Sequence, residues 1–219
     1  MSAQPLRVTD LHAYYGESHV LHGINCQLNA GEVVTLLGLV GSRSGSVLIN
    51  GQETITLPPH RIARLGVGYC PEERGIYASL STEENLLLPP PLAAGGTTVE
   101  EIYQMFPHLR ERRHSRGTHL SGGEQQMLAL ARILRTGARL LLLDEISEGL
   151  APVIVQALSR TIQALRAQGY TIIMAEQNFR FAAPLADRFY IMERGRIVDS
   201  FAASLLEAKM AMLHEFLGV

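Results

Sequence analysis

Residues 140–174 read LLLLDEISEGLAPVIVQALSRTIQALRAQGYTIIM, and this stretch decides the fold class. Leu140–Leu143 is a short apolar run, as expected of a buried strand. Pro152–Gln168 is predicted to be a helix, because proline stands at its start and Gly169 follows its end. Thr171–Met174 is apolar again. A strand, a helix and a second strand in this order predict a βαβ unit with a parallel sheet, and hence an α/β fold.

The flanking segments differ from this stretch and from each other. Residues 5–55 carry strand signals, among them the apolar run 32–37 and the hairpin dipeptide Asn50-Gly51. Residues 78–139 are helical in character. A length of 219 residues is long for one compact domain and short for two. We therefore expect a single domain with a helical lobe inserted in it.

Composition narrows the classes of function. Hydrophobic residues make up 47% of the chain and charged residues 18%, below the average of roughly 25% charged residues in soluble proteins. This favours a large core and a surface that is buried against a partner. The net charge of −2 gives no basic field for nucleic acid or anionic lipid. The sequence has neither an apolar run near the roughly 20 residues of a membrane span nor a signal pattern at its start, so we expect a cytosolic protein.

Cysteine and histidine do not indicate a metal centre. Cys26 and Cys70 lie far apart among apolar residues, which is typical of buried reduced thiols. The eight histidines form no i, i+4 pair around an acid and do not cluster with cysteine. No metal site built from histidine is predicted.

Two adjacent acids, Asp144 and Glu145, follow the run 140–143. The carboxyl ends of strands in open α/β sheets are the edge at which ligands bind. In nucleotide hydrolases of the phosphate-loop class, an aspartate here holds Mg²⁺ and a following glutamate accepts a proton from the attacking water. Taken alone, the pair is equally compatible with two solvated acids in a turn.

The segment 120–126 reads LSGGEQQ and is predicted to open a helix. Ser121 and Glu124 have the spacing of a capping box. Gly122 and Gly123 leave the first backbone N–H groups open to an anion at the positive end of the helix. With the Asp-Glu pair about twenty residues further on, this segment resembles the signature of the ABC ATPase family.

The resemblance implies a fold and its organisation. The fold would be an α/β, P-loop NTPase-like ABC ATPase core with a parallel sheet, an antiparallel β subdomain and an inserted α-helical subdomain. A single domain would span residues 1–219. Residues 1–77 and 140–219 would form the nucleotide-binding core, and 78–139 the helical subdomain.

The resemblance also assigns a site for ATP and Mg²⁺. Asp144 would hold the metal, Glu145 would be the catalytic base, and Gln177 would stand at the switch loop, where histidine is usual in the family. Gln177 could donate a hydrogen bond to the γ-phosphate but could not titrate. The residues implied to contact the nucleotide are Tyr15, Gly38, Glu72, Ser121, Gly122 and Gly123. Among them Tyr15 would stack on adenine, and Glu72 replaces the usual glutamine of the Q-loop.

One branch of the family matches in further detail. Tyr14-Tyr15-Gly16, the segment 147–152 and the tripeptide 176–178 resemble the ATPase subunits of branched-chain amino acid importers. The subunits of urea and short-chain amide importers are closely similar. The resemblance implies a peripheral location on the cytoplasmic face of the cell membrane and no nucleic acid. The implied partners are transmembrane permease subunits, a second ATP-binding subunit and, indirectly, a periplasmic or extracellular solute-binding protein.

One expected motif is missing. After the strand at 33–37, a loop G-x-x-x-x-G-K-[ST] and a helix should follow, but Gly38–Ser46 reads GLVGSRSGS without lysine. Either about fifteen residues are missing from this sequence between Leu37 and Leu39, or the loop is truly deleted, although a βαβ crossover needs ten or more residues. In the second case the protein would be a hydrolysis-dead subunit that only docks. A soluble ABC ATPase acting on DNA or ribosomes is a third reading, but this chain has none of the coiled-coil or tandem domains usual there.

Overall fold

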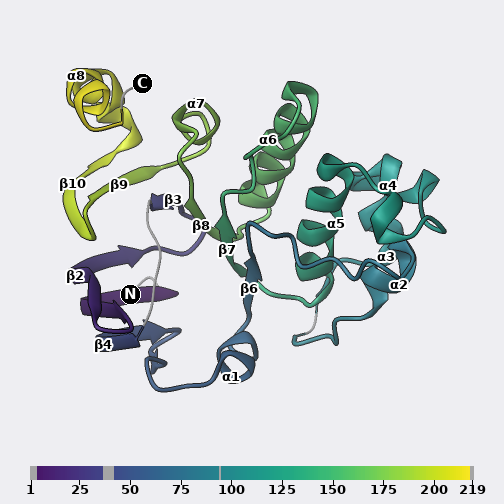
Figure 1. Ribbon diagram of the computed structural model, residues 1–219, viewed down its shortest axis with the longest axis horizontal. Coiled ribbons are helices and arrows are strands. Elements are labelled where there is room, and N and C mark those ends of the chain that lie inside the picture. The colour runs from purple at the N-terminus through teal and green to yellow at the C-terminus, as the bar shows by residue number, and fades with distance from the viewer. Residues whose placement is uncertain (1–3, 37–41, 94, 218–219) are drawn as a thin grey trace.

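The computed structural model describes residues 4–36, 42–93 and 95–217, whose strands form two sheets (Figure 1). The smaller sheet has the strand order β2-β1-β4-β5 and consists of β1 (Leu6–Tyr15), β2 (Ser18–Leu28), β4 (Ser42–Ile49) and β5 (Gln52–Glu53). The larger sheet has the order β10-β9-β3-β8-β7-β6 and consists of β3 (Val33–Leu36), β6 (Val67–Cys70), β7 (Leu140–Asp144), β8 (Thr171–Ala175), β9 (Arg188–Glu193) and β10 (Arg196–Ala202).

The larger sheet is parallel at its centre, as the βαβ pattern predicts. Strands β6, β7 and β8 run parallel with matched ends, so that Cys70 pairs with Leu143 and Asp144 pairs with Ala175. β3 runs parallel to both β8 and β9, and only β10 is antiparallel to its neighbour. The smaller sheet is antiparallel throughout. The α/β fold class with an added antiparallel sheet is confirmed.

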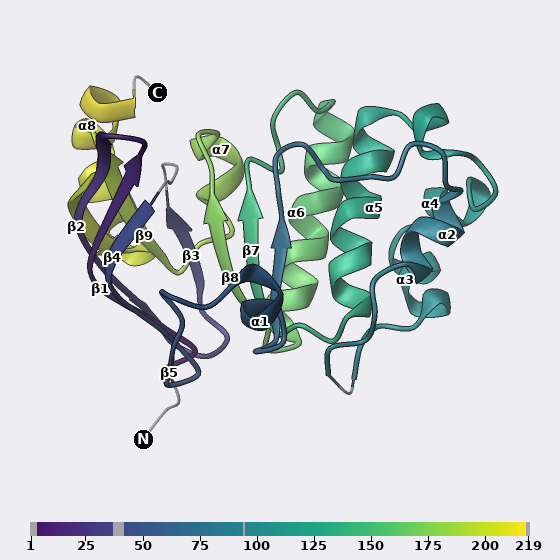
Figure 2. The same ribbon diagram turned by 60° about the horizontal axis from the view of Figure 1, so that its bottom comes forward.

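The helices follow the caps that the sequence predicts. They are α1 (Pro59–Ala63), α2 (Thr82–Leu87), α3 (Val99–Met105), α4 (Pro107–Glu111), α5 (Gly122–Arg135), α6 (Pro152–Ala167), α7 (Phe179–Ala182) and α8 (Leu206–Leu217), with short 3₁₀ turns at Gly117–His119 and Ala203–Leu205. Thr98 and Ser121 both form capping boxes, which begin α3 and α5. Helices α2 to α4 lie together beyond α5, at the far end of the molecule from the smaller sheet (Figures 1 and 2).

Two main apolar clusters join these layers. In the first, Leu128 of α5 and Leu158 of α6 pack with Leu141 of β7, and all three are fully buried. In the second, Ile24 of β2 packs with Ile173 of β8, which ties the smaller sheet to the larger one. The strand edges that carry polar residues are therefore held on a rigid scaffold.

Local expectations elsewhere are also confirmed. Asn50 and Gly51 turn between β4 and β5 with φ values of 49° and 79°, as a tight hairpin requires. Cys26 and Cys70 are buried free thiols, and burial raises the pKa of each to about 12. None of the helices described is long and apolar enough to serve as a bilayer span.

The segment after β3 bears on the missing loop. Only positions 37–41 separate Leu36 at the end of β3 from Ser42 at the start of β4. Five positions are fewer than the eight residues of G-x-x-x-x-G-K-[ST] alone, without its helix. Gly38 and the junction between Leu37 and Leu39 lie outside the described residues.

Candidate functional site

The carboxyl ends of β6, β7 and β8 meet at one edge of the larger sheet, the upper edge in Figure 2. Asp144 is the last residue of β7 and Glu145 follows it. Gln177 lies two residues beyond the end of β8. Because α5 leads directly into β7, its amino terminus at Ser121 points toward the same edge. The fold thus brings the predicted acids, the switch-loop residue and the glycine-rich helix start to one side of the molecule.

Glu145 has an unusual backbone conformation that the neighbouring strand holds. Its φ is 45°, in the left-handed region that costs a residue with a side chain about 1–3 kcal/mol. The backbone N–H of Glu145 donates to the carbonyl of Ala175 at 2.8 Å. The side-chain amide of Gln177 donates to Oε1 of Glu145 at 2.5 Å. The carboxylate is therefore oriented by residues of the adjacent strand and loop.

Asp144 is paired with a tyrosine. The hydroxyl of Tyr69, on β6, donates to Oδ2 of Asp144 at 3.0 Å. Burial raises the pKa of Asp144, as do the charges of Glu145 and Glu73, while the bond from Tyr69 lowers it. Burial and the bond to Asp144 raise the pKa of Tyr69 to about 12, so its hydroxyl keeps its proton at neutral pH.

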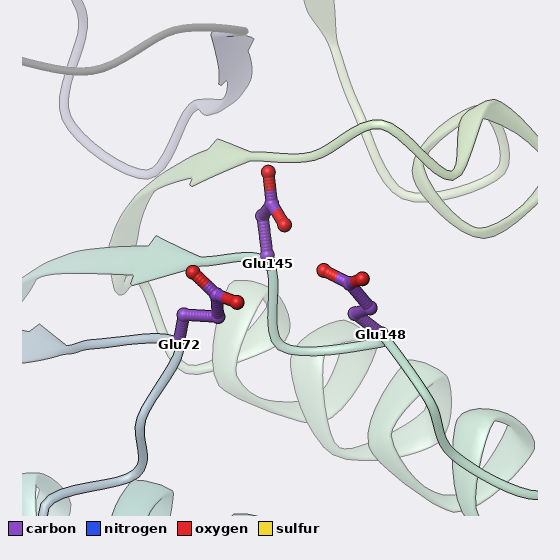
Figure 3. A group of neighbouring side chains, drawn as sticks. All are labelled: Glu72, Glu145 and Glu148. Carbon is purple, nitrogen blue, oxygen red and sulfur yellow. The ribbon is translucent and has the colours of Figure 1, made fainter.

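A second carboxylate group lies beside this pair. Glu72, Glu145 and Glu148 place one carboxylate oxygen each within 4.8 Å of one another (Figure 3). Glu72 and Glu148 are exposed and Glu145 is half-buried. A hydrogen bond and the charge of Glu145 raise the pKa of Glu148. Carboxylate oxygens are the ligands that Mg²⁺ prefers, so the donor set at this edge fits a hard divalent cation.

A buried acid supports the turn after Glu145. Glu176, which is 3% exposed, accepts hydrogen bonds from the backbone N–H of Ser147 at 3.1 Å and from its hydroxyl at 2.9 Å. Burial raises the pKa of Glu176 to about 7, against the opposing effect of the two bonds from Ser147. Through these bonds, Glu176 connects the turn that contains Ser147 and Glu148 to the carboxyl end of β8.

Close packing around the start of α5 limits which side chains fit at Gly122 and Gly123. A Cβ atom on Gly123 would lie 2.7 Å from Cγ1 of Ile154, in the first turn of α6. A Cβ atom on Gly122 would lie 3.2 Å from the tip of the Arg74 side chain. Gly123 is therefore required by the contact between α5 and α6, whereas Gly122 lies beside a movable side chain.

Arg74 links the loop after β6 to α5. Its guanidinium donates to Gln125 Oε1 at 3.2 Å and to Gln126 Oε1 at 3.3 Å. Arg132 of α5 also donates to the carbonyl of Gly75. These hydrogen bonds connect the loop that contains Glu72 to the helix that begins at Gly122.

Of the predicted residues, the structure brings Asp144, Glu145, Gln177 and Glu72 together at this edge, whereas Ser121, Gly122 and Gly123 lie at the start of α5, beside Arg74 and Ile154. The backbone of Tyr15 ends β1, but its side chain lies outside the described residues, as does Gly38. No role was predicted from sequence for Tyr69, or for Ser147, Glu148 and Glu176, although the last three lie in the segments 147–152 and 176–178 that carry the family resemblance. Tyr69 precedes Glu72 in the segment that resembles the Q-loop, and this was the signal for it in the sequence.

The phosphate-binding lysine has no substitute at this edge. The 219-residue sequence has one lysine, Lys209. It lies on α8, where its Nζ pairs with Asp199 Oδ2 at 2.7 Å. The described residues at this edge therefore offer carboxylates to a metal ion, but they include no lysine that could hold the β- and γ-phosphates.

Comparisons with known proteins agree with this geometry. Residues 36–148 match the family model described as ABC transporter. The chain is 39% identical to the high-affinity branched-chain amino acid transport ATP-binding protein BraG of Pseudomonas aeruginosa, over 90% of this chain and 93% of that protein. It is 30% identical to the lipopolysaccharide export ATP-binding protein LptB of Escherichia coli K12, over 85% of each chain. A dimeric ATP-binding cassette in a post-hydrolysis state with ADP and phosphate superposes with a TM-score of 0.76 at 18% identity, over 90% of this chain and 98% of that one.

The alignment with BraG also has a bearing on the missing loop. It runs over 217 positions but covers 90% of 219 residues, which is about 197. About 20 positions of BraG therefore face gaps in this chain. This number exceeds the eight residues of G-x-x-x-x-G-K-[ST].

Proposed function

The chain belongs to the ABC transporter family as an ATP-binding subunit, and from this premise we propose that it powers the import of branched-chain amino acids. The similarity to BraG, higher than that to LptB, supports this substrate class. The polypeptides that select the solute are separate, so import of urea or short-chain amides is the alternative within the same mechanism.

The observation that carries the hydrolytic role is the convergence of Asp144, Glu145 and Gln177 at one strand edge. Asp144 would hold Mg²⁺, which neutralises charge on the β- and γ-phosphates. Glu145, oriented by Gln177, accepts the proton of the attacking water. Gln177 keeps one hydrogen-bonding pattern at every pH because an amide does not titrate in this range.

The phosphate cradle is the part of the mechanism that the 219-residue sequence lacks. ATP hydrolysis in this family depends on backbone N–H groups and a lysine that hold the phosphates. A protein with this sequence alone therefore docks in a transporter without turning over ATP. A gene product with about twenty further residues between β3 and β4 regains the cradle and hydrolyses ATP.

The signature helix would serve a second ATP-binding subunit. The first N–H groups of a helix have no intrahelical acceptor, so those of Gly122 and Gly123 are available to an anion. Two copies related by a twofold axis would sandwich two ATP molecules. Ser121, Gly122 and Gly123 of one copy would then face phosphates bound by the other.

Membrane subunits would dock beside the loop that contains Glu72. The docking surface would consist of Tyr77, Leu87 and Leu88, which are 52%, 54% and 48% exposed. Leu86 is fully buried and does not contribute to it. These apolar side chains lie at the end of α2 and on the segment before it, and they would face the membrane subunits. A periplasmic or extracellular solute-binding protein would act only through the permease, and no nucleic acid takes part.

One experiment tests the central proposal. The intact mass of the protein purified from its native source distinguishes the 219-residue chain, which weighs 24.0 kDa, from a longer chain with further residues between β3 and β4. A heavier protein that hydrolyses ATP supports the motor role, and a 24.0 kDa protein without turnover supports the docking role. A 24.0 kDa protein with ATPase activity would refute our account of the phosphate cradle. Leucine, urea and lipopolysaccharide transport in a deletion strain would then decide the substrate.

A further inference from the structure

The hairpin of β1 and β2 gathers three histidines and an aspartate. His12 Nδ1 lies 3.0 Å from His19 Nε2, and the other ring nitrogen of His12 lies 3.2 Å from Asp10 Oδ1. The ring centroids of His19 and His22 are 3.9 Å apart. The histidine rings are only partly exposed. The sequence predicted no metal site built from histidine, and its spacing gave no sign that these three rings lie together.

Strand pairing explains why the rings meet. Tyr14 pairs directly with His19 across the hairpin, and His12 is two residues from Tyr14, on the same face of β1. The Tyr14 and His19 rings stack with centroids 4.3 Å apart. Bulges between Leu11 and Tyr14 shift the register of the two strands, and this shift places His12 beside His19.

The two facing nitrogens have the separation of ligands to one ion. Two imidazole nitrogens at 2.0–2.1 Å from a tetrahedral zinc ion are about 3.3 Å apart. The observed 3.0 Å between His12 Nδ1 and His19 Nε2 is close to this value. In the absence of metal, the same two atoms share a hydrogen bond.

Asp10 selects the nitrogen of His12 that is free to coordinate. If His12 Nε2–H donates to Asp10 Oδ1, the lone pair of Nδ1 faces His19. Carboxylate, histidine and metal in this order are the usual arrangement that orients a metal-binding imidazole. Asp10 is thus an outer partner and not a ligand.

We propose that His12 and His19 bind a borderline divalent transition metal such as Zn²⁺, with His22 as third ligand after a side-chain rotation and water completing the shell. Among the described residues, only Glu72, Glu145 and Glu148 already converge within 4.8 Å, so the rotation of His22 is a required part of the site. Imidazole nitrogen favours Zn²⁺, Ni²⁺ and Cu²⁺ over Mg²⁺, which prefers oxygen. The ion would cross-link β1 to β2 close to Tyr15, and this site is independent of the proposed ATPase role.

Calorimetric titration with Zn²⁺ in excess Mg²⁺ tests the site, because Mg²⁺ prefers oxygen ligands and would compete with Zn²⁺ at the carboxylates of Glu72, Glu145 and Glu148. The unaltered chain should bind one equivalent. His12→Asn and His19→Asn should each weaken binding about 100-fold, and Asp10→Asn about tenfold. His60→Asn is the matched control, since His60 is exposed on α1 away from the hairpin, and it should bind Zn²⁺ as the unaltered chain does.

A second measurement needs no variant. Electron paramagnetic resonance of the unaltered protein with one equivalent of Cu²⁺ should show nitrogen hyperfine splitting from at least two imidazoles. Absence of that splitting, or equal Zn²⁺ affinity in His12→Asn, His19→Asn and the His60→Asn control, would overturn the proposal. Loss of binding in the hairpin variants alone supports it whether or not the protein hydrolyses ATP.

Discussion

The side-chain amide of Gln177 donates a hydrogen bond to Oε1 of Glu145, with 2.5 Å between the two atoms. The bond connects the loop after β8 to the residue that follows β7. It orients the carboxylate without adding a titratable group beside it. The consequences for hydrolysis apply to the form of the protein that carries a phosphate loop.

Glu145→Gln should reduce steady-state ATP hydrolysis by at least about 100-fold, because an amide cannot accept the proton of water. Nucleotide affinity should be retained, since the shape of the side chain is kept. Glu148→Gln is the control, because Glu148 lies in the same carboxylate group but is not assigned to proton transfer. Near-normal turnover in Glu145→Gln would remove Glu145 as the base.

Tyr69→Phe should raise the Mg²⁺ concentration needed for half-maximal hydrolysis about tenfold, because the hydroxyl that orients Asp144 is lost. The bond from Tyr69 lowers the pKa of Asp144, so its removal raises that pKa and moves the acid limb of the activity profile to higher pH. Mg²⁺ titrations at several pH values measure both effects. Tyr77→Phe, which alters an exposed tyrosine away from Asp144, should change neither.

Glu176 should make stability fall as pH rises. Its pKa is about 7 in the folded protein and 4.5 as a free side chain, so the folded state binds more protons between these values. At 1.36 kcal/mol per unit, the loss of unfolding free energy between pH 4.5 and 7 is about 3 kcal/mol. Urea unfolding at a series of pH values should show this slope in the unaltered chain and a flatter one in Glu176→Gln. Glu17→Gln, at an exposed position, should leave the slope unchanged, and an unchanged slope in Glu176→Gln would contradict the assignment.

Gly123→Ala should destabilise the fold by about 1–3 kcal/mol, because the added methyl group would overlap Ile154. Gly122→Ala should cost less, since the flexible end of Arg74 can move aside. The double variant Gly123→Ala with Ile154→Ala should remove the overlap and show non-additive energies. Equal unfolding free energies for the two single variants would rule out a packing role for Gly123.

Local sequence was sufficient for much of the fold. The run 140–143, the capping residues Ser121 and Thr98 and the dipeptide Asn50-Gly51 each specify an element through interactions between neighbours in the chain. The α/β class followed from the order of such elements, and the resemblance to ABC ATPases came from the motif at 120–126 together with Asp144 and Glu145. The position of Asp144 at a strand end was also readable, because an apolar run stops there.

Tertiary structure decided which side chains meet. Tyr69 and Asp144 are 75 positions apart, and they touch because β6 and β7 are neighbours in register. The pair Ser147–Glu176 likewise depends on β7 lying beside β8. The histidine cluster on β1 and β2 depends on the bulges that shift one strand against the other. Local patterns set the period and the ends of each element, but contacts between distant residues depend on strand order and register, which arise only when the whole core packs.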